Sequence, residues 1–196
     1  MAAYPRCGAG RRGGSRVSGA AVTGYRPQRM TLSLPSVHLR AIVCEADGTL
    51  VADVGAPTPD EPTLLALDRV RRCGLLVAVV YDGDDSVGRR LGEALGPIDL
   101  ALAPDPDECT YGRADEVRPR FVHRTCASLG VLPAACAVVA GRRRLLDAAT
   151  WAGAATVMVP TDATPPFEVR AQRRVAADLW SALDALRIPT FVGSAP

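Results

Sequence analysis

A strand that ends in two acidic residues and a tight turn is the feature that most constrains the fold of this chain. Residues 41–51 read AIVCEADGTLV. A short apolar run bounded by turn residues is typical of a buried strand in a parallel sheet. Glu45 and Asp47 follow at its carboxyl end, the edge of an open α/β sheet where ligands bind. The segment therefore predicts a parallel sheet with a polar site at its edge.

Apolar strands alternate with amphipathic helices along the rest of the chain. Such alternation is the signature of a parallel sheet with helices on both faces. We expect a single α/β domain over residues 39–188 with about five strands, followed by a short tail at residues 189–196. The expected strands are 40–45, 75–81, 98–103, 135–140 and 155–160, and the expected helices are 61–73, 85–95, 118–129, 142–152 and 174–187.

The beginning of the chain has a different composition. Residues 1–40 contain seven arginines and no acidic residue, although the whole chain carries a net charge of only +2. The Gly- and Arg-rich stretch 8–15 buries little apolar surface, so we expect residues 1–38 to be a disordered extension, with Met30 as an alternative start. A basic extension can attract nucleic acid or an anionic membrane. No sequence motif supports either, and we expect no specific nucleic-acid partner and no membrane partner.

Hydropathy and cysteine usage bear on the compartment. No run approaches the length of a transmembrane helix, and the N-terminus lacks the apolar core of a secretory signal. Six cysteines form no CxxC pair, which in a chain of 196 residues indicates reduced thiols. We therefore expect a cytoplasmic protein. The sequence leaves its oligomeric state open.

Further segments extend the pattern that begins at Glu45. They are LGPID at 95–99, LGV at 129–131, VMVPT at 157–161 and the stretch 176–186. With the first segment they resemble the haloacid dehalogenase (HAD) phosphatases, in particular the capless branch containing histidinol-phosphate phosphatases and D-glycero-D-manno-heptose 1,7-bisphosphate 7-phosphatases. The resemblance implies a HAD-like Rossmannoid three-layer sandwich. Only about 25 residues separate Leu50 from Leu75, which leaves no room for an inserted cap domain.

The resemblance assigns roles to the residues of the first segment. Glu45 falls where the family has its nucleophilic aspartate, and its extra methylene moves the reacting oxygen by about 1 Å, which can cost on the order of 100-fold in rate. Asp47 matches the general acid/base of the family. Gly48 and Thr49 complete the ligand-binding turn. The first segment thus keeps the charge of the family motif but alters its nucleophile.

The second and third family motifs are also altered. Tyr81 and Asp82 stand where the family has a Ser or Thr that holds the phosphoryl oxygens. Tyr81 can donate a hydrogen bond, whereas Asp82 would repel phosphate. The position of the family's lysine falls on Glu116, and Arg118 is the substitute cation nearby, although arginine and lysine are not equivalent at a close-packed site.

The magnesium motif shows the largest change. Arg142 replaces the first acidic ligand, and only Asp147 stands for the second. Charge neutralisation by metal and cation supplies most of the catalysis of phosphoryl transfer. We expect no metal ligands in this chain, and magnesium only if the protein is an active enzyme. We also expect no zinc, since one plausible ligand occurs among the four positions of the branch's zinc loop, which are Ala103, Asp105, Cys109 and Tyr111.

The run Arg142–Arg144 lies where a helix is expected to begin, an end that favours anions. Two interpretations stand. All three side chains point to solvent, or one guanidinium replaces the missing cation by pairing with Glu45 and Asp47 or by holding a ligand's phosphate.

We expect a catalytically degenerate phosphatase-like protein that binds a phosphorylated small molecule, such as a sugar phosphate, or a protein partner. A first alternative is a weak magnesium-dependent phosphomonoester hydrolase with Glu45 as nucleophile, Asp47 as acid/base and Arg118 as cation. A second is a structural subunit whose open crevice docks against another protein.

Overall fold

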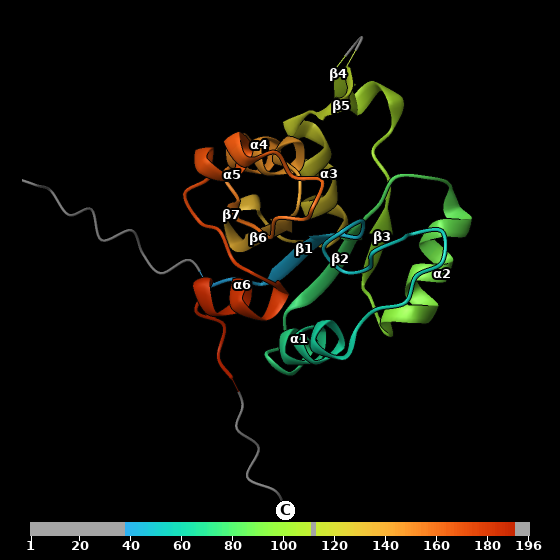
Figure 1. The fold of residues 1–196 in the computed structure, drawn as a ribbon, viewed down its shortest axis with the longest axis vertical. Helices are drawn as coiled ribbons and strands as arrows, with labels where there is room; N and C mark the ends of the chain where they lie inside the picture. The colour runs from blue at the N-terminus through green and yellow to red at the C-terminus, as the bar shows by residue number, and fades with distance from the viewer. Residues whose placement is uncertain (1–37, 111–112, 191–196) are drawn as a thin grey trace, which may run out of the picture. The chain divides into compact units, whose positions relative to one another are not determined.

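The computed structural model describes residues 38–110 and 113–190. The extension expected at residues 1–38 falls outside them except for its last residue, and so does most of the tail expected at 189–196. The described residues form a parallel sheet with helices on both faces (Figure 1). Its strands are β1 (Ala41–Glu45), β2 (Leu76–Val80), β3 (Leu100–Leu102), β6 (Cys136–Ala140) and β7 (Ala155–Met158). The helices are α1 (Glu61–Arg72), α2 (Asp85–Leu95), α3 (Pro119–Ser128), α4 (Arg143–Ala152), α5 (Pro166–Ala171) and α6 (Leu179–Ala185).

The strand order of the sheet is β3-β2-β1-β6-β7, with every neighbouring pair parallel. The chain first builds outward from β1 through β2 to β3 and then returns to place β6 on the other side of β1. The order therefore reverses between β1 and β6. In open sheets this is the point where a crevice forms outside the carboxyl ends of the strands.

The two faces of the sheet bury separate cores, because successive side chains of a strand point to opposite faces. Ile42 and Cys44 of β1 pack with α1, α2 and α6. Ala41 and Val43 pack on the other face with α3 and α4. Glu45 follows in the same alternation and turns toward the α4 side. The three-layer α/β sandwich expected from the sequence is confirmed.

The connections differ from the sequence expectations in two places. Between β3 and α3 lie a 3-10 turn, η1 (Pro106–Glu108), and an antiparallel hairpin of β4 (Cys109–Thr110) and β5 (Arg113–Val117), where we expected only a loop. A second 3-10 turn, η2 (Pro133–Ala135), precedes β6. The last helix was expected at 174–187 and begins only at Leu179. The preceding segment is instead extended and pairs with β7, as Met158 N–H donates to the Arg174 carbonyl at 3.0 Å.

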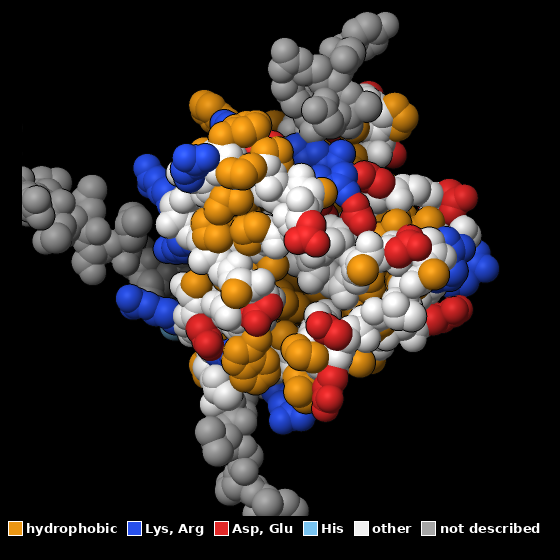
Figure 2. Space-filling model, in the orientation of Figure 1, with side chains coloured by type: hydrophobic (Ala, Val, Ile, Leu, Met, Phe, Trp, Pro, Cys, Tyr) orange, Lys and Arg blue, Asp and Glu red, His pale blue; other side chains and the backbone are white. Residues whose placement is uncertain are grey.

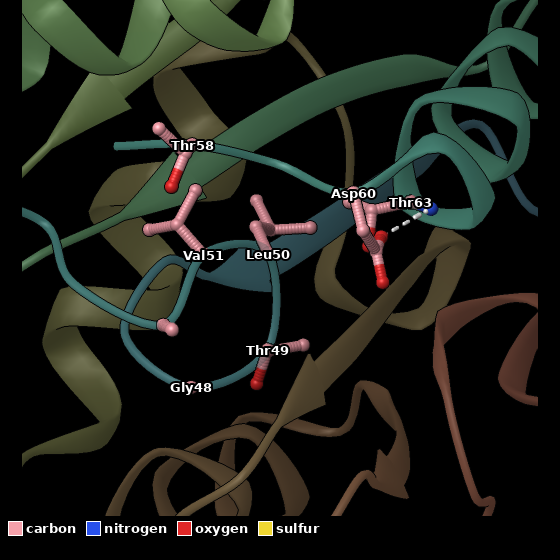
Figure 3. A pocket seen from close by; sticks show the side chains of 8 residues that line it. Gly48, Thr49, Leu50, Val51, Thr58, Asp60 and Thr63 are labelled. Carbon is pink, nitrogen blue, oxygen red and sulfur yellow. Dashed lines mark hydrogen bonds between the residues drawn. The ribbon is translucent and has the colours of Figure 1, made fainter. Parts of the chain in front are cut away.

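A short loop, residues 51–60, joins the first turn to α1, so no cap domain is inserted there. Asp60 begins α1 by accepting a hydrogen bond from the Thr63 backbone N–H at 2.8 Å (Figure 3). Within residues 38–110 and 113–190, no helix is long and apolar enough to cross a bilayer.

Candidate functional site

Glu45 ends β1 as a buried acid, 4% exposed, at the edge where the strand order reverses. Its Oε2 accepts hydrogen bonds from the backbone N–H groups of Gly141 at 3.0 Å and Arg142 at 3.1 Å. These groups lie just before the first turn of α4, so the carboxylate occupies an anion-binding position at that helix end. Burial raises the pKa of Glu45, and Arg142, Arg144 and the two backbone N–H groups offset only part of this effect.

The guanidinium of Arg142 lies among three carboxylates. It forms an ion pair with Asp47, its Nε lies 3.8 Å from Glu45 Oε1, and another nitrogen lies 3.7 Å from Asp82 Oδ2. Arg144 also pairs with Asp82 and lies 3.9 Å from Glu45 Oε1. The loops after β1, β2 and β6 are thus joined by one charged cluster of Glu45, Asp47, Asp82, Arg142 and Arg144, which we call the arginine cluster.

The arginine cluster decides between the two interpretations of the run at the start of α4. Arg142 and Arg144 turn inward to the carboxylates, so the interpretation in which all three arginines point to solvent is wrong. The side chain of Arg143 is exposed, as that interpretation expects. Its Nε lies 2.8 Å from the carboxylate of Asp147 on the next turn of the helix. Asp147 therefore pairs along α4 and does not belong to the cluster.

The turn after Asp47 packs very closely against the loop after β7. Gly48 has a φ of +72°, and a Cβ at this position would lie 2.5 Å from Thr161 Cγ2. A Cβ at Gly141 would meet the same methyl group at 2.9 Å and Thr49 Oγ1 at 3.5 Å. Both positions need glycine, since any larger residue would push the three loops apart. The Thr49 hydroxyl is buried and has no partner among the described residues.

Two hollows border this turn. A cleft of about 490 Å³ lies on the side of Arg142 and is lined by Asp47, Gly48, Ala52, Arg142, Thr161, Asp162 and Ala163. A second hollow of about 220 Å³ lies against residues 48–52 and the start of α1. Figure 3 shows the residues that line this second hollow. The side chain of Thr49 points to one side of the turn, and those of Leu50 and Val51 point to the other. The larger cleft is the one that reaches the arginine cluster.

Tyr81 does not join the site that the sequence predicted for it. Its side chain is buried in the core on the α1, α2 and α6 face of the sheet. A Cβ at Gly88 of α2 would lie 2.5 Å from the Tyr81 hydroxyl, so this hydroxyl points at α2. Burial raises the pKa of Tyr81, and the nearby carboxylates of Asp85 and Asp84 raise it further. The neighbouring Asp82, which was expected to repel phosphate, instead contributes to the arginine cluster.

Arg118 lies at the start of α3, and its backbone bonds to Glu108 and Phe121. No ion pair or hydrogen bond within the described residues joins it to Glu45 or Asp47. The pKa of Asp107 is lowered mainly by a hydrogen bond from Arg120, with a smaller contribution from Arg118, which places Arg118 near the η1 loop. The side chain of Glu116 is outside the part that the structure describes.

The arginine cluster does not suit a divalent metal. Magnesium is held by carboxylate and water oxygens in a near-octahedral shell. Here the Asp47 carboxylate is paired with Arg142, and Glu45 uses one oxygen on two backbone N–H groups. A fixed guanidinium among these oxygens would repel Mg²⁺. No group of three or more potential metal-binding side chains occurs in the described ranges.

A second arginine holds the loop that aligns with the zinc loop of the phosphatase branch. Arg124 of α3 donates to the Ala103 carbonyl at 3.0 Å and to Glu108 Oε1 at 2.8 Å, and it lies 3.5 Å from Asp105 Oδ2. Glu108 is buried, and its other oxygen also pairs with Arg124. Cys109 is a free thiol, and Tyr111 lies outside the described residues. Because the Ala103 carbonyl and the Asp105 carboxylate both interact with Arg124, this loop does not offer a set of zinc ligands.

Sequence reasoning missed three participants of the site. Thr161 closes on both glycines, although its segment was recognised as part of the family pattern. Arg144 was treated only as a member of a run. Glu168 of α5 accepts a hydrogen bond from the Arg143 backbone N–H at 3.2 Å and so covers the end of α4. Thr161, in the segment 157–161, and Arg144, two residues after Arg142, carried a sequence signal, whereas Glu168 carried none.

Comparison with known proteins supports the fold. No protein-family model matches the sequence, and no curated protein matches it either. Solved structures do match. A D,D-heptose 1,7-bisphosphate phosphatase from B. bronchiseptica, complexed with magnesium and phosphate, is similar at 20% identity and a TM-score of 0.56, over 76% of this chain and 98% of the other.

Two further structures show the same likeness. A HAD phosphatase from Thermococcus onnurineus matches at 12% identity and a TM-score of 0.61, over 76% of this chain and 99% of the other. The deoxy-D-mannose-octulosonate 8-phosphate phosphatase from Haemophilus influenzae, in a cobalt-bound form, matches at 17% identity and a TM-score of 0.55, over 72% of this chain and 80% of the other. The chain therefore has the fold of HAD phosphatases.

Proposed function

We propose that this chain, which has the HAD phosphatase fold, is a catalytically degenerate protein that binds a phosphorylated small molecule of the sugar phosphate type. The observation that carries the proposal is the position of Arg142. Its guanidinium pairs with Asp47 and lies 3.8 Å from Glu45, so a side chain supplies the positive charge that a metal supplies in a phosphatase. Because Arg142 supplies this positive charge, binding of a phosphorylated ligand would not require magnesium.

The same arrangement argues against hydrolysis. Glu45 would have to attack phosphorus with a carboxylate oxygen, yet its Oε2 accepts two backbone N–H bonds and its Oε1 faces Arg142 and Arg144, which makes it a weak nucleophile. Asp47 is held by Arg142 and is not poised to exchange a proton. Hydrolysis by Glu45 and Asp47 with Arg118 as the cation would also require Arg118 to reach them.

The chemistry of the cleft favours a ligand with both a phosphate and hydroxyl groups. Arg142 is 40% exposed, and a guanidinium binds phosphate oxygens with two parallel hydrogen bonds. Asp47 and Asp162 provide carboxylates that accept hydrogen bonds from sugar hydroxyls, and Thr161 provides a hydroxyl. A cleft of about 490 Å³ is of the size that holds a small molecule.

The five free cysteines among the described residues suit a role in the reducing cytoplasm.

Thermal unfolding with and without ligand tests the proposal. Inorganic phosphate and a set of sugar phosphates, each without added metal, should raise the melting temperature by about 2–4 °C at saturating concentration. The shift should be lost in Arg142→Ala and kept in Arg89→Ala, an exposed arginine of α2 that serves as the matched control. If none of these ligands shifts the wild-type protein, the binding role is wrong.

An activity assay distinguishes the alternative. The proposal predicts no magnesium-dependent hydrolysis of p-nitrophenyl phosphate above the rate without protein. Turnover that requires magnesium and disappears in Asp47→Asn would instead establish the weak phosphatase.

A further inference from the structure

A second candidate site lies along β7, which is the edge strand on the opposite side of the sheet from β3. β7 pairs with β6 along one side, and on its outer side Met158 pairs with Val175 of the segment before α6. Beside it is a groove of about 430 Å³ lined by α4, the start of β7 and the segment after α5. The lining residues are Arg143, Asp147, Thr150, Ala154, Ala155, Thr156, Ala171, Gln172, Arg173 and Arg174. We call this the β7 groove.

The backbone of β7 offers an open hydrogen-bonding position in this groove. Val159 N–H donates to the Ala140 carbonyl of β6 at 3.0 Å, so residue 159 faces the sheet. Met158 faces the other way, because its N–H donates to Arg174 and its carbonyl accepts from Ala176 at 2.8 Å. Backbone groups alternate along a strand, so the N–H and C=O of Thr156 also point outward. Within the described residues, neither makes a backbone hydrogen bond on that side.

The charge of the groove indicates what would fit there. Three arginines and one aspartate line it, which gives a net charge of +2. Arg173 and Arg174 are exposed, and Figure 2 shows basic side chains gathered along the edge of the molecule where α5 lies. The extension of this chain is a poor occupant, since residues 1–40 carry seven arginines and no acid. Residues 189–196 carry no acid either. Neither segment supplies the negative charge that would complement the groove.

We propose that the β7 groove docks an extended acidic segment of a partner protein, whose main chain bonds to Thr156 and whose carboxylates meet Arg143, Arg173 and Arg174. An exposed strand edge supplies main-chain hydrogen bonds to an extended peptide, and side chains around it supply selectivity. Trp151 and Val175, each next to a lining residue in sequence, are 82% and 45% exposed and offer apolar contacts beside the groove. This site is separate from the cleft at Arg142, so either proposal can fail without the other.

Fluorescence anisotropy of the full chain with a labelled peptide tests this inference. The probe is an eight-residue peptide of alternating glutamate and valine. It should bind, and the double variant Arg173→Glu, Arg174→Glu should weaken binding by roughly tenfold or more, because like charges then face each other. The matched control is Arg89→Glu, Arg187→Glu, which changes the net charge equally at two exposed arginines outside the groove and should bind as the wild type does.

A change in the peptide tests the main-chain contact without altering the fold of the protein. The same peptide with N-methylated central residues cannot donate or pair along β7 and should bind at least several-fold more weakly. The inference is overturned if the glutamate–valine peptide does not bind or if the arginine reversal leaves its affinity unchanged. It is also overturned if a single-stranded oligonucleotide binds through Arg173 and Arg174 more tightly than the peptide. Dimerisation in sedimentation that the reversal abolishes would assign the groove to a second copy and overturn it as well.

Discussion

The carboxylate of Asp47 and the guanidinium of Arg142 form an ion pair that joins the loop after β1 to the start of α4. The resemblance to phosphatases implies an acidic magnesium ligand at the position of Arg142. In this chain, the positive charge between the loop after β1 and the start of α4 belongs to the side chain of Arg142. The carboxyl edge of the sheet is therefore held together by a residue that cannot dissociate.

Removal of this arginine should destabilise the fold through charge repulsion. In Arg142→Ala, Asp47 loses its ion pair, and Arg144 remains beside Glu45 and Asp82. Because Arg142 is partly exposed, we expect a loss of about 1–2 kcal/mol in the free energy of unfolding, less than for a fully buried pair. Urea denaturation measures it, and Arg142→Lys should recover part of the loss. A value equal to that of Arg89→Ala would show that the ion pair does not stabilise the protein.

The pH dependence of stability should report the buried Glu45. Its pKa in the folded protein lies above the ordinary value of 4.5, mainly because of burial. The folded state thus keeps a proton over a pH range in which the unfolded state has lost it. This contribution to stability is complete below pH 4.5 and is lost as the pH rises through the raised pKa.

The variant Glu45→Gln isolates this effect, because glutamine does not titrate. The unfolding free energy of the variant, relative to wild type, should increase as the pH rises from about 4.5 toward neutrality. Urea denaturation at several pH values provides the comparison, in which other titrating groups cancel. A relative stability that falls with rising pH would mean that the ion pairs with Arg142 and Arg144 outweigh burial.

The close approach of two loops predicts the effect of a single methyl group. Gly48→Ala forces a positive φ on alanine and places its Cβ 2.5 Å from Thr161 Cγ2. The backbone effect alone costs about 1–2 kcal/mol, and the steric clash adds to it. Gly130→Ala is the matched control, since its φ is +66° and nothing lies within 4 Å of an added Cβ.

Thermal and urea unfolding should therefore show a larger loss for Gly48→Ala than for Gly130→Ala. Thr161→Ser removes the clashing methyl group. The double variant Gly48→Ala, Thr161→Ser should therefore lose about as much stability, relative to Thr161→Ser alone, as Gly130→Ala loses relative to the wild type. Equal losses for the two single variants would contradict the packing of these loops.

The loop held by Arg124 should depend on that residue. Arg124→Ala leaves the buried Glu108 without its arginine partner and with the Asp105 backbone N–H still bonded to it, and we expect a loss of about 2–3 kcal/mol in the free energy of unfolding. Arg120→Ala breaks an exposed pair with Asp107 and should cost less than about 1 kcal/mol. Added zinc should restore neither variant. Rescue of Arg124→Ala by zinc would show that the loop keeps a zinc site.

The sequence was sufficient for the sheet because its strands are continuous apolar runs. Residues 41–45 and 136–140 are buried throughout, and such runs identify strands of a parallel sheet directly. Residues 174–178 were expected to be helical because their composition fits a helix, whereas the backbone around Val175 pairs with Met158 at the end of β7. A contact between distant segments overrides local propensity in such a case.

The membership of the site was predictable only in part, since Tyr81 and Arg118 were expected in it and lie elsewhere. The resemblance pointed to Glu45, Asp47, Asp82 and Arg142, which the fold brings together. It could not show that Tyr81 turns toward Gly88 of α2, because the direction of a side chain after a strand depends on the packing around it. The position of Thr161 against Gly48 depends likewise on the spacing of three loops, which no local pattern encodes.

The most direct test of the account is a magnesium titration of the melting temperature. If Arg142 replaces the metal, the wild-type protein should melt at the same temperature, within about 1 °C, with or without saturating Mg²⁺. The variant Arg142→Asp, which places a carboxylate where the resemblance implies a metal ligand, should gain a rise of about 2–4 °C. A rise of that size in the wild-type protein would contradict the central claim, because it would mean that Mg²⁺ binds despite Arg142.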